Sequence, residues 1–194
     1  MAKLIVSNLI SLDGYCAGPG GNPGALPMDA AFDAYNTERL RAAGTLVFGA
    51  TTFSMFRGYW PAVGQNADAP ASQREIARLN GPMPKLVVSD RLNVKAAEPW
   101  GDAELVRRAQ AHERIRQLKR ETERDLLVFG SHVLWNDLLA HGLVDELHLL
   151  VGPVVLGDGV RAFEGGLPAP LRLIGQRQLA GSGTVLLQYA SGQA

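Results

Sequence analysis

The chain has 194 residues, of which 46% are hydrophobic, and it carries 19 basic and 19 acidic side chains. This length suits one domain with a core of its own, and the balanced charge excludes a strong field that would attract nucleic acid or an anionic membrane. The sequence has neither the pattern of a secretory leader nor an apolar run long enough to span a membrane. We therefore expect a cytoplasmic protein, folded as one domain over residues 1–194, with no nucleic-acid or membrane partner.

Short apolar runs alternate with longer segments of helical period, which is typical of an α/β layered domain. The last two runs flank the turn Gly181-Ser182-Gly183, which indicates an antiparallel hairpin and hence a mixed sheet. In chain order we expect a strand over 3–12, a helix over 29–43, a strand over 45–49, a helix over 71–80, a strand over 85–89, a helix over 102–121, a strand over 125–129, a helix over 131–141, and strands over 144–154, 171–179 and 184–189.

Cysteine and histidine usage gives no sign of a structural metal. The single cysteine, Cys16, excludes an intramolecular disulfide. The four histidines show none of the Cys/His spacings that are typical of zinc sites, so we expect no metal. We interpret His132 and His148 as structural or surface residues and Cys16 as a small packing residue.

Residues 126–142, LLVFGSHVLWNDLLAHG, combine a buried strand, a Gly-Ser turn and a helix that ends at a glycine. The first amides of such a helix are unpaired and its dipole is positive there, so the turn indicates a site for phosphate. The alternative is that Ser131 only caps the helix. This segment alone leaves both interpretations open.

Five motifs in order resemble the dihydrofolate reductase superfamily, and most closely the reductase-domain branch of the bifunctional riboflavin-biosynthesis deaminase-reductase. They are SLDGYCAG, GATTF, KLVVSDRL, LLVFGSHVLWNDLL and GLVDELHLLVGPVVLGDG, and the resemblance spans about residues 4–189. It implies a three-layer α/β fold with a mixed, mostly parallel central sheet, flanking helices and a C-terminal antiparallel hairpin. It also implies a homodimer that uses NADPH to transfer hydride to a small nitrogen heterocycle of the pteridine or pyrimidine type.

The resemblance implies where the cofactor binds. In the family a Gly-Gly pair at the start of a helix holds the pyrophosphate, and Gly130-Ser131 occupies that place. Ala50 stands where dihydrofolate reductases often have an arginine for the 2'-phosphate, so NADH is also possible; Arg91 could supply this charge or be a solvated turn residue. The cofactor-binding residues that the resemblance implies are Ala17, Gly49, Thr52, Ser89, Arg91, Gly130, Ser131, His132, Val133 and Leu134.

The resemblance also implies catalytic and substrate-binding residues. The Gly/Pro-rich tract of residues 18–27 corresponds to a loop that closes over the nicotinamide, and Asp29 follows it as the acid that would anchor the substrate. Asp33, one turn later, is the second catalytic candidate, and Asp13 and Trp135 are candidate substrate-binding residues. Asp29 could instead only cap the helix, and Trp135 could be a core residue.

The sequence contains no cytidine-deaminase-like zinc motif, which excludes a complete bifunctional riboflavin enzyme within this chain. Hydride transfer needs little from a protein beyond placement of the cofactor and substrate, so the lack of an obvious strong acid does not exclude a reductase. The alternative is a nucleotide- or flavin-binding protein of the same fold without reductase turnover.

Overall fold

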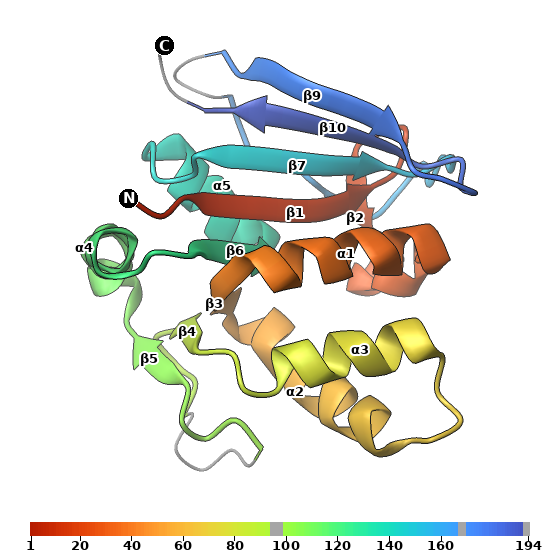
Figure 1. Cartoon of the computed structure of the whole chain (residues 1–194). Coiled ribbons are helices and arrows are strands. Elements are labelled where there is room, and N and C mark those ends of the chain that lie inside the picture. Colours follow the sequence, from red (N-terminus) through yellow and green to blue (C-terminus); the bar gives the residue numbers. More distant parts are fainter. Residues whose placement is uncertain (94–98, 167–169, 192–194) are drawn as a thin grey trace.

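The computed structural model describes residues 1–93, 99–166 and 170–191, and in them one sheet of eight strands forms the centre of the molecule (Figure 1). The strands follow the order β5-β4-β3-β6-β1-β7-β10-β9. Their bounds are Leu4–Ile10 for β1, Ala43–Gly49 for β3, Lys85–Val88 for β4, Glu104–Val106 for β5, Asp125–Phe129 for β6, Glu146–Val151 for β7, Arg172–Gln178 for β9 and Val185–Ala190 for β10. A separate two-stranded ladder pairs β2, Tyr15–Ala17, with β8, Val160–Arg161.

Among the described strands, neighbours from β5 to β7 pair in parallel, whereas β10 pairs antiparallel with both β7 and β9. In the described part of the chain, five α-helices flank the sheet: α1 over Ala30–Ala42, α2 over Ala50–Gln65, α3 over Ala71–Asn80, α4 over Arg108–Glu121 and α5 over His132–Ala140. This arrangement confirms the expected three-layer fold with its mixed, mostly parallel sheet and C-terminal hairpin. Within the described ranges, no helix has both the length and the apolar character needed to cross a membrane.

The central strands β1, β3, β4, β6 and β7 are mainly buried, and their nearly continuous apolar runs are typical of strands that are covered on both faces, whereas β9 is exposed. In β1, Leu4 and Val6 belong to a cluster with residues of α4 and α5, whereas Ile5 belongs to a cluster with residues of α1, α2 and α3. Figure 1 shows α1, α2 and α3 in front of the sheet and α5 behind it. Because the strands from β5 to β7 are parallel, their carboxyl ends all lie at one edge of the sheet. Helices lie on both sides of that edge.

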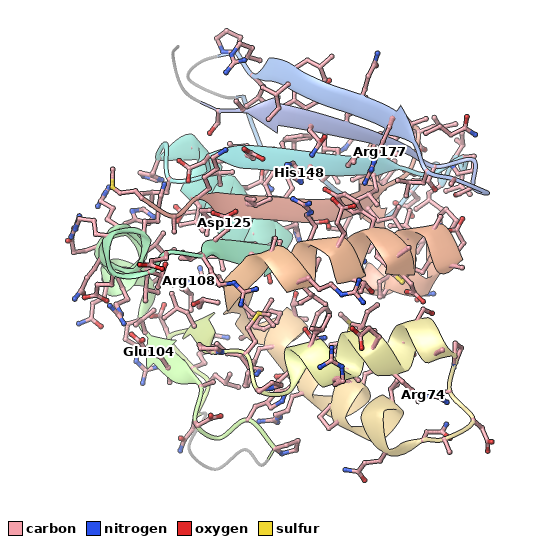
Figure 2. All side chains as sticks on the ribbon, viewed as in Figure 1. Arg74, Glu104, Arg108, Asp125, His148 and Arg177 are labelled. Atoms are coloured by element: carbon pink, nitrogen blue, oxygen red, sulfur yellow. The ribbon has the colours of Figure 1, made fainter. Side chains whose placement is uncertain are left out.

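A buried polar group joins α1 to the sheet at β7. His148 lies in β7 (Figure 2) and is fully buried. Its Nδ1 shares a hydrogen bond of 2.6 Å with the hydroxyl of Tyr35, and its Nε2 lies 2.9 Å from Oε2 of Glu146. Burial lowers the pKa of His148, which favours the neutral ring. The structural role expected of His148 agrees with this position.

One of the expected elements was wrong in part, and others were missed. The helix expected over 102–121 is in fact strand β5 followed by α4, which begins only at Arg108. Helix α2 was missed because Gly58 and Pro61 lie inside it, and both residues disfavour a helix interior. Its aromatic residues override these preferences: Phe56 packs against Phe48 of β3 and against Trp60 one turn later. The short β2–β8 ladder left no clear pattern in the sequence.

Candidate functional site

A cavity of about 800 Å³ lies at the edge where the parallel strands end. Asn8 lies in the second half of β1, Gly49 ends β3, Ser89 follows β4 and Gly130 follows β6, and all four line the cavity. The first turns of α2, α4 and α5 line it too, together with residues 164–166 and parts of residues 16–23. Ligands of open α/β sheets bind at this edge, where the loops diverge.

Two hydrogen bonds connect the junction between β3 and α2 to the junction between β6 and α5. The amide of Gly49 donates to Oγ of Ser131 at 3.1 Å, and the amide of Ser131 donates to Oγ1 of Thr52 at 3.0 Å. Gly130 and Ser131 both have left-handed backbone conformations, with φ of +51° and +52°. A Cβ on Gly130 would lie 3.3 Å from Oγ1 of Thr52, so glycine suits both the backbone conformation and the close contact.

The helix beginnings that these bonds hold together have backbone amides available for a ligand. Among the described residues, no side chain caps α2 or α5, and neither helix has an acidic residue in its first turn. Ser131 therefore does not cap α5, because its hydroxyl is turned to Gly49 instead. Two positive helix ends with uncapped amides face one cavity, which is the arrangement that favours an anion.

Most of the cofactor-binding residues expected from the sequence lie together in this cavity. Its lining includes Ala17, Gly49, Thr52, Ser89, Gly130, Ser131, His132, Val133 and Leu134. Arg91 does not line it: this residue is exposed, and its backbone amide bonds to Oγ of Ser89. Arg108 at the start of α4 (Figure 2) lines the cavity. Its guanidinium lies 3.7 Å from Oδ2 of Asp90.

The two acids expected to be catalytic do not line the cavity. Asp29 caps α1: its Oδ1 accepts a bond of 2.9 Å from the amide of Phe32. Its Oδ2 accepts a bond of 2.5 Å from the hydroxyl of Ser182, and this bond lowers the pKa of Asp29. Asp33 is buried and accepts a bond of 2.9 Å from the hydroxyl of Ser72 in α3. Both carboxylates thus hold α1 to neighbouring segments.

The two expected substrate-binding residues also lie outside the cavity lining. Asp13 accepts bonds from the amides of Leu156 and Gly157, at 3.1 and 2.7 Å, and so braces the loop after β7. Trp135 is fully buried in the cluster beneath α5 and packs edge-on against Phe163, with ring centroids 5.3 Å apart. Trp135 is therefore a core residue, which was the alternative to substrate binding in the sequence analysis.

The cavity contains polar side chains whose contacts the sequence did not indicate. Asn8 is only 7% exposed, and its Nδ2 has no hydrogen-bond partner within the described part of the chain. His132 was expected only for its backbone, but its Nε2 lies 3.3 Å from Oε1 of Glu164. Asn136 holds the segment that carries Glu164, since its Nδ2 donates to the carbonyl of Ala162 at 2.8 Å and its Oδ1 accepts from the amide of Glu164 at 3.1 Å.

Cys16 lines the cavity from β2 and is half-buried. Burial raises the pKa of its thiol, and the nearby charge of Glu164 adds to this effect. The protonated thiol is a weak nucleophile. Cys16 therefore contributes packing surface to the cavity wall, as the sequence suggested.

Comparisons with known proteins show similarity to riboflavin-biosynthesis proteins and, in fold, to dihydrofolate reductase. The family model of the RibD C-terminal domain matches residues 2–186. Uncharacterized protein YyaP of Bacillus subtilis (strain 168) is 29% identical over 161 residues, which cover 83% of this chain and 80% of that protein. A putative riboflavin biosynthesis protein from Shewanella sp. PV-4 has a similar structure, with a TM-score of 0.67, 24% identity and 100% coverage of both chains. Dihydrofolate reductase from Enterococcus faecalis, complexed with NADP(H) and RAB-propyl, has a TM-score of 0.59 and 15% identity over 98% of this chain and 97% of that chain.

The capping role of Asp29 leads to a prediction about stability. Replacing an N-cap aspartate by alanine removes the acceptor for an unpaired helix amide, so Asp29→Ala should lower the free energy of unfolding by about 1 kcal/mol. Asp29→Asn is the matched control, because asparagine caps helices as well as aspartate does. Urea denaturation monitored by circular dichroism measures both variants. Equal losses for alanine and asparagine would show that the carboxylate charge, and not the cap, is what matters.

Proposed function

Since the chain belongs to the RibD C-terminal domain family, we propose that it is an NAD(P)H-dependent reductase that transfers hydride to a small nitrogen heterocycle of the pteridine or pyrimidine type. The observation that carries this proposal is the pair of helix beginnings, α2 and α5, that face one cavity of about 800 Å³. A further support is that the dihydrofolate reductase of the same fold was solved with NADP(H).

The residues at the cavity fit a dinucleotide. The uncapped amides of residues 50–52 and 132–134 are donors for the two phosphates of a pyrophosphate, and no acidic side chain of either first turn opposes them. The bonds between Gly49, Thr52 and Ser131 fix these donors before a ligand arrives, which reduces the entropy lost on binding. The cavity volume lies within the usual range for small-molecule sites. When bound, the nicotinamide would supply the hydride.

Asn8 is the residue proposed to orient a ligand at the inner wall of the cavity. A buried amide without a partner costs about 1–3 kcal/mol, so a fold that keeps one at Asn8 beside a cavity is consistent with a bond to a ligand acceptor. A carbonyl or ring nitrogen of the nicotinamide amide or of the heterocycle would satisfy it. The imidazole of His132, whose Nε2 lies 3.3 Å from Oε1 of Glu164, offers a second polar contact for a ligand.

The catalytic role that the resemblance implies for Asp29 and Asp33 stays a prediction, and the proposed site does not depend on it. The same holds for substrate contacts of Asp13 and Trp135 and for the homodimer. Because hydride transfer needs chiefly placement of the two reactants, the chain's own contribution in this proposal is to bind, orient and exclude water. The β2 strand and the loop over residues 21–23 close one side of the cavity for that purpose.

The proposal is tested first by binding and then by turnover. Titration with NADPH, NADH and a flavin identifies the cofactor, and oxidation of the bound NAD(P)H in the presence of a panel of pteridines and pyrimidines identifies a substrate. Consumption of NADPH that depends on one heterocycle supports the reductase. Tight binding of a nucleotide or flavin without consumption by any member of the panel would instead favour the binding protein without turnover.

A charge placed in the first turn of α5 tests where the phosphates bind. Val133 lines the cavity and the residue is 46% exposed, so we expect a polar side chain to be accommodated there. Val133→Asp should weaken NADPH binding about tenfold or more, because a carboxylate would repel the phosphates. The substitution should not lower the free energy of unfolding, because an acidic residue in the first turn of a helix is favourable.

Val133→Asn is the control, because asparagine has the same shape without the charge. Fluorescence titration of NADPH against both variants and the wild-type protein gives the three dissociation constants. If the aspartate and asparagine variants bind NADPH equally well, the pyrophosphate does not lie at the start of α5.

Arg108 replaces Arg91 as the side chain proposed to select NADPH over NADH. It lines the cavity at the start of α4, whereas Arg91 does not. A hydrogen bond between charged groups contributes about 1.5–3 kcal/mol, and Arg108 is 72% exposed at its side chain, so we expect the lower part of this range. Arg108→Ala should reduce the preference for NADPH about tenfold and leave NADH binding unchanged.

Arg91→Ala is the matched control and should leave both dissociation constants unchanged. Isothermal titration of each variant with each dinucleotide gives the four values. A loss of preference in Arg91→Ala but not in Arg108→Ala would return the role to Arg91.

A further inference from the structure

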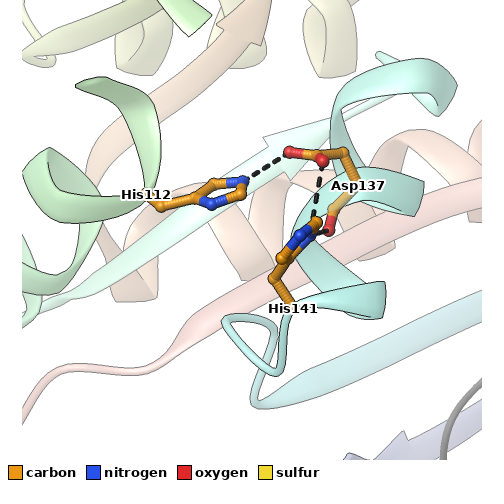
Figure 3. Close-up of side chains that lie close together, drawn as sticks. All are labelled: His112, Asp137 and His141. Carbon is orange, nitrogen blue, oxygen red and sulfur yellow. Dashed lines mark hydrogen bonds and ion pairs between the residues drawn. The ribbon is translucent and has the colours of Figure 1, made fainter. Parts of the chain in front are cut away.

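Helices α4 and α5 bring His112, Asp137 and His141 together at one end of the cavity (Figure 3). Nε2 of His112 lies 2.6 Å from Oδ2 of Asp137, and Nδ1 of His141 lies 3.3 Å from Oδ1 of the same carboxylate. One ligand atom from each of the three residues lies within 4.8 Å of the other two. The centroids of the two imidazole rings are only 4.4 Å apart.

These three groups form a known type of donor set for a transition-metal ion. Two imidazole nitrogens and one carboxylate oxygen suit Zn²⁺ and neighbouring divalent ions, with a water molecule in the remaining position. Around a tetrahedral zinc with bonds of about 2.0–2.1 Å, the ligand atoms lie about 3.3–3.5 Å apart. The carboxylate oxygens of Asp137 are already 2.6 and 3.3 Å from the two nitrogens, so small side-chain rotations would open the cluster around an ion.

The positions of the three residues on the helices favour such a site. Asp137 and His141 are four residues apart in α5 and its C-terminal cap, so they share one face of the helix. His112 meets them from the second turn of α4. The side chains are 28%, 48% and 54% exposed for His112, Asp137 and His141, so an ion and its water can reach the cluster from solvent.

The simpler alternative is that Asp137 only forms hydrogen bonds that hold α4 against α5. The nitrogen Nδ1 of His141 does have such a bond available, since it lies 2.8 Å from the backbone carbonyl of Asp137. That bond would have to be released for Nδ1 to coordinate an ion. Hydrogen bonding alone, however, does not need two imidazoles on one carboxylate, and the two explanations differ in a measurable way.

We propose that His112, Asp137 and His141 form a binding site for a divalent transition-metal ion of the zinc class. The ion would connect α4 to α5 through bonds much stronger than the present hydrogen bonds. Since His112 and Asp137 also line the cavity, the ion would add positive charge to the cavity wall near Arg108. This site is independent of the proposed reductase function, because its ligands need no dinucleotide to be in place.

The test is titration of the untagged full chain with Zn²⁺ in the absence of any nucleotide. Competition with a chromophoric chelator should give one ion per chain with a dissociation constant in the micromolar range or below. His112→Ala, Asp137→Asn and His141→Gln should each weaken this binding at least tenfold. His132→Gln is the control, because His132 lies in the same cavity but outside the cluster, and this variant should bind Zn²⁺ as the wild-type protein does.

Thermal unfolding gives a second measurement that also reports on folding. Zn²⁺ should raise the melting temperature of the wild-type protein and of His132→Gln, but not that of the three cluster variants, whose far-ultraviolet circular dichroism should match the wild type. The cluster residues are exposed enough for at least one of these variants to fold. Absence of Zn²⁺ binding by the wild-type protein, or equal binding by the folded cluster variants, would overturn the proposal. Failure of the reductase assay would not affect this result.

Discussion

Two hydrogen bonds between the β3–α2 and β6–α5 junctions hold two helix beginnings side by side. They form because β3 and β6 are parallel neighbours, paired through Val47 and Val128. The segments that follow the two strands therefore leave the sheet at the same place. Each bond contributes only about 0.5–1.5 kcal/mol net. Their larger effect is geometric, since they fix which amides remain unpaired and toward which cavity those amides face.

The layered core supports this junction from both sides. Trp135 and Leu138 of α5 are fully buried behind the sheet, while Phe53 of α2 is fully buried in front of it. Neither helix can shift along the sheet without disturbing a packed cluster, and packed interiors resist such shifts. Asn136 extends the rigid region outward by holding the segment with Glu164 against α5. The cavity is therefore a consequence of packing around it and does not depend on a ligand.

The sequence predicted the parts of the fold and site that follow from local pattern and from the family resemblance. Apolar runs located most strands within a few residues, and the Gly-Ser turn after β6 located the start of α5. Side-chain direction could not be predicted in the same way. Asp29 was placed correctly at the start of α1, but its carboxylate turns to Ser182, a residue in a distant turn.

Contacts between distant segments explain the remaining differences. Because strand β5 was included in a longer helix, Arg108 was expected in mid-helix, and its true position at the start of α4 on the cavity was missed. His112 and Asp137 belong to different helices, so no spacing in the sequence connects them, although their side chains lie 2.6 Å apart. Asn8 was hidden in an apolar strand, where an unpaired amide shows itself only once its neighbours are known.

The central claim is that the amides at the beginnings of α2 and α5 bind the phosphates of a dinucleotide. Two-dimensional ¹H–¹⁵N spectra of the protein, recorded as NADPH is added, test it directly. The largest changes in amide chemical shift should occur at residues 50–52 and 132–134, because these donors would gain charged acceptors. Saturating NADPH that leaves those amides unchanged, or that perturbs only residues away from the cavity, would contradict the account.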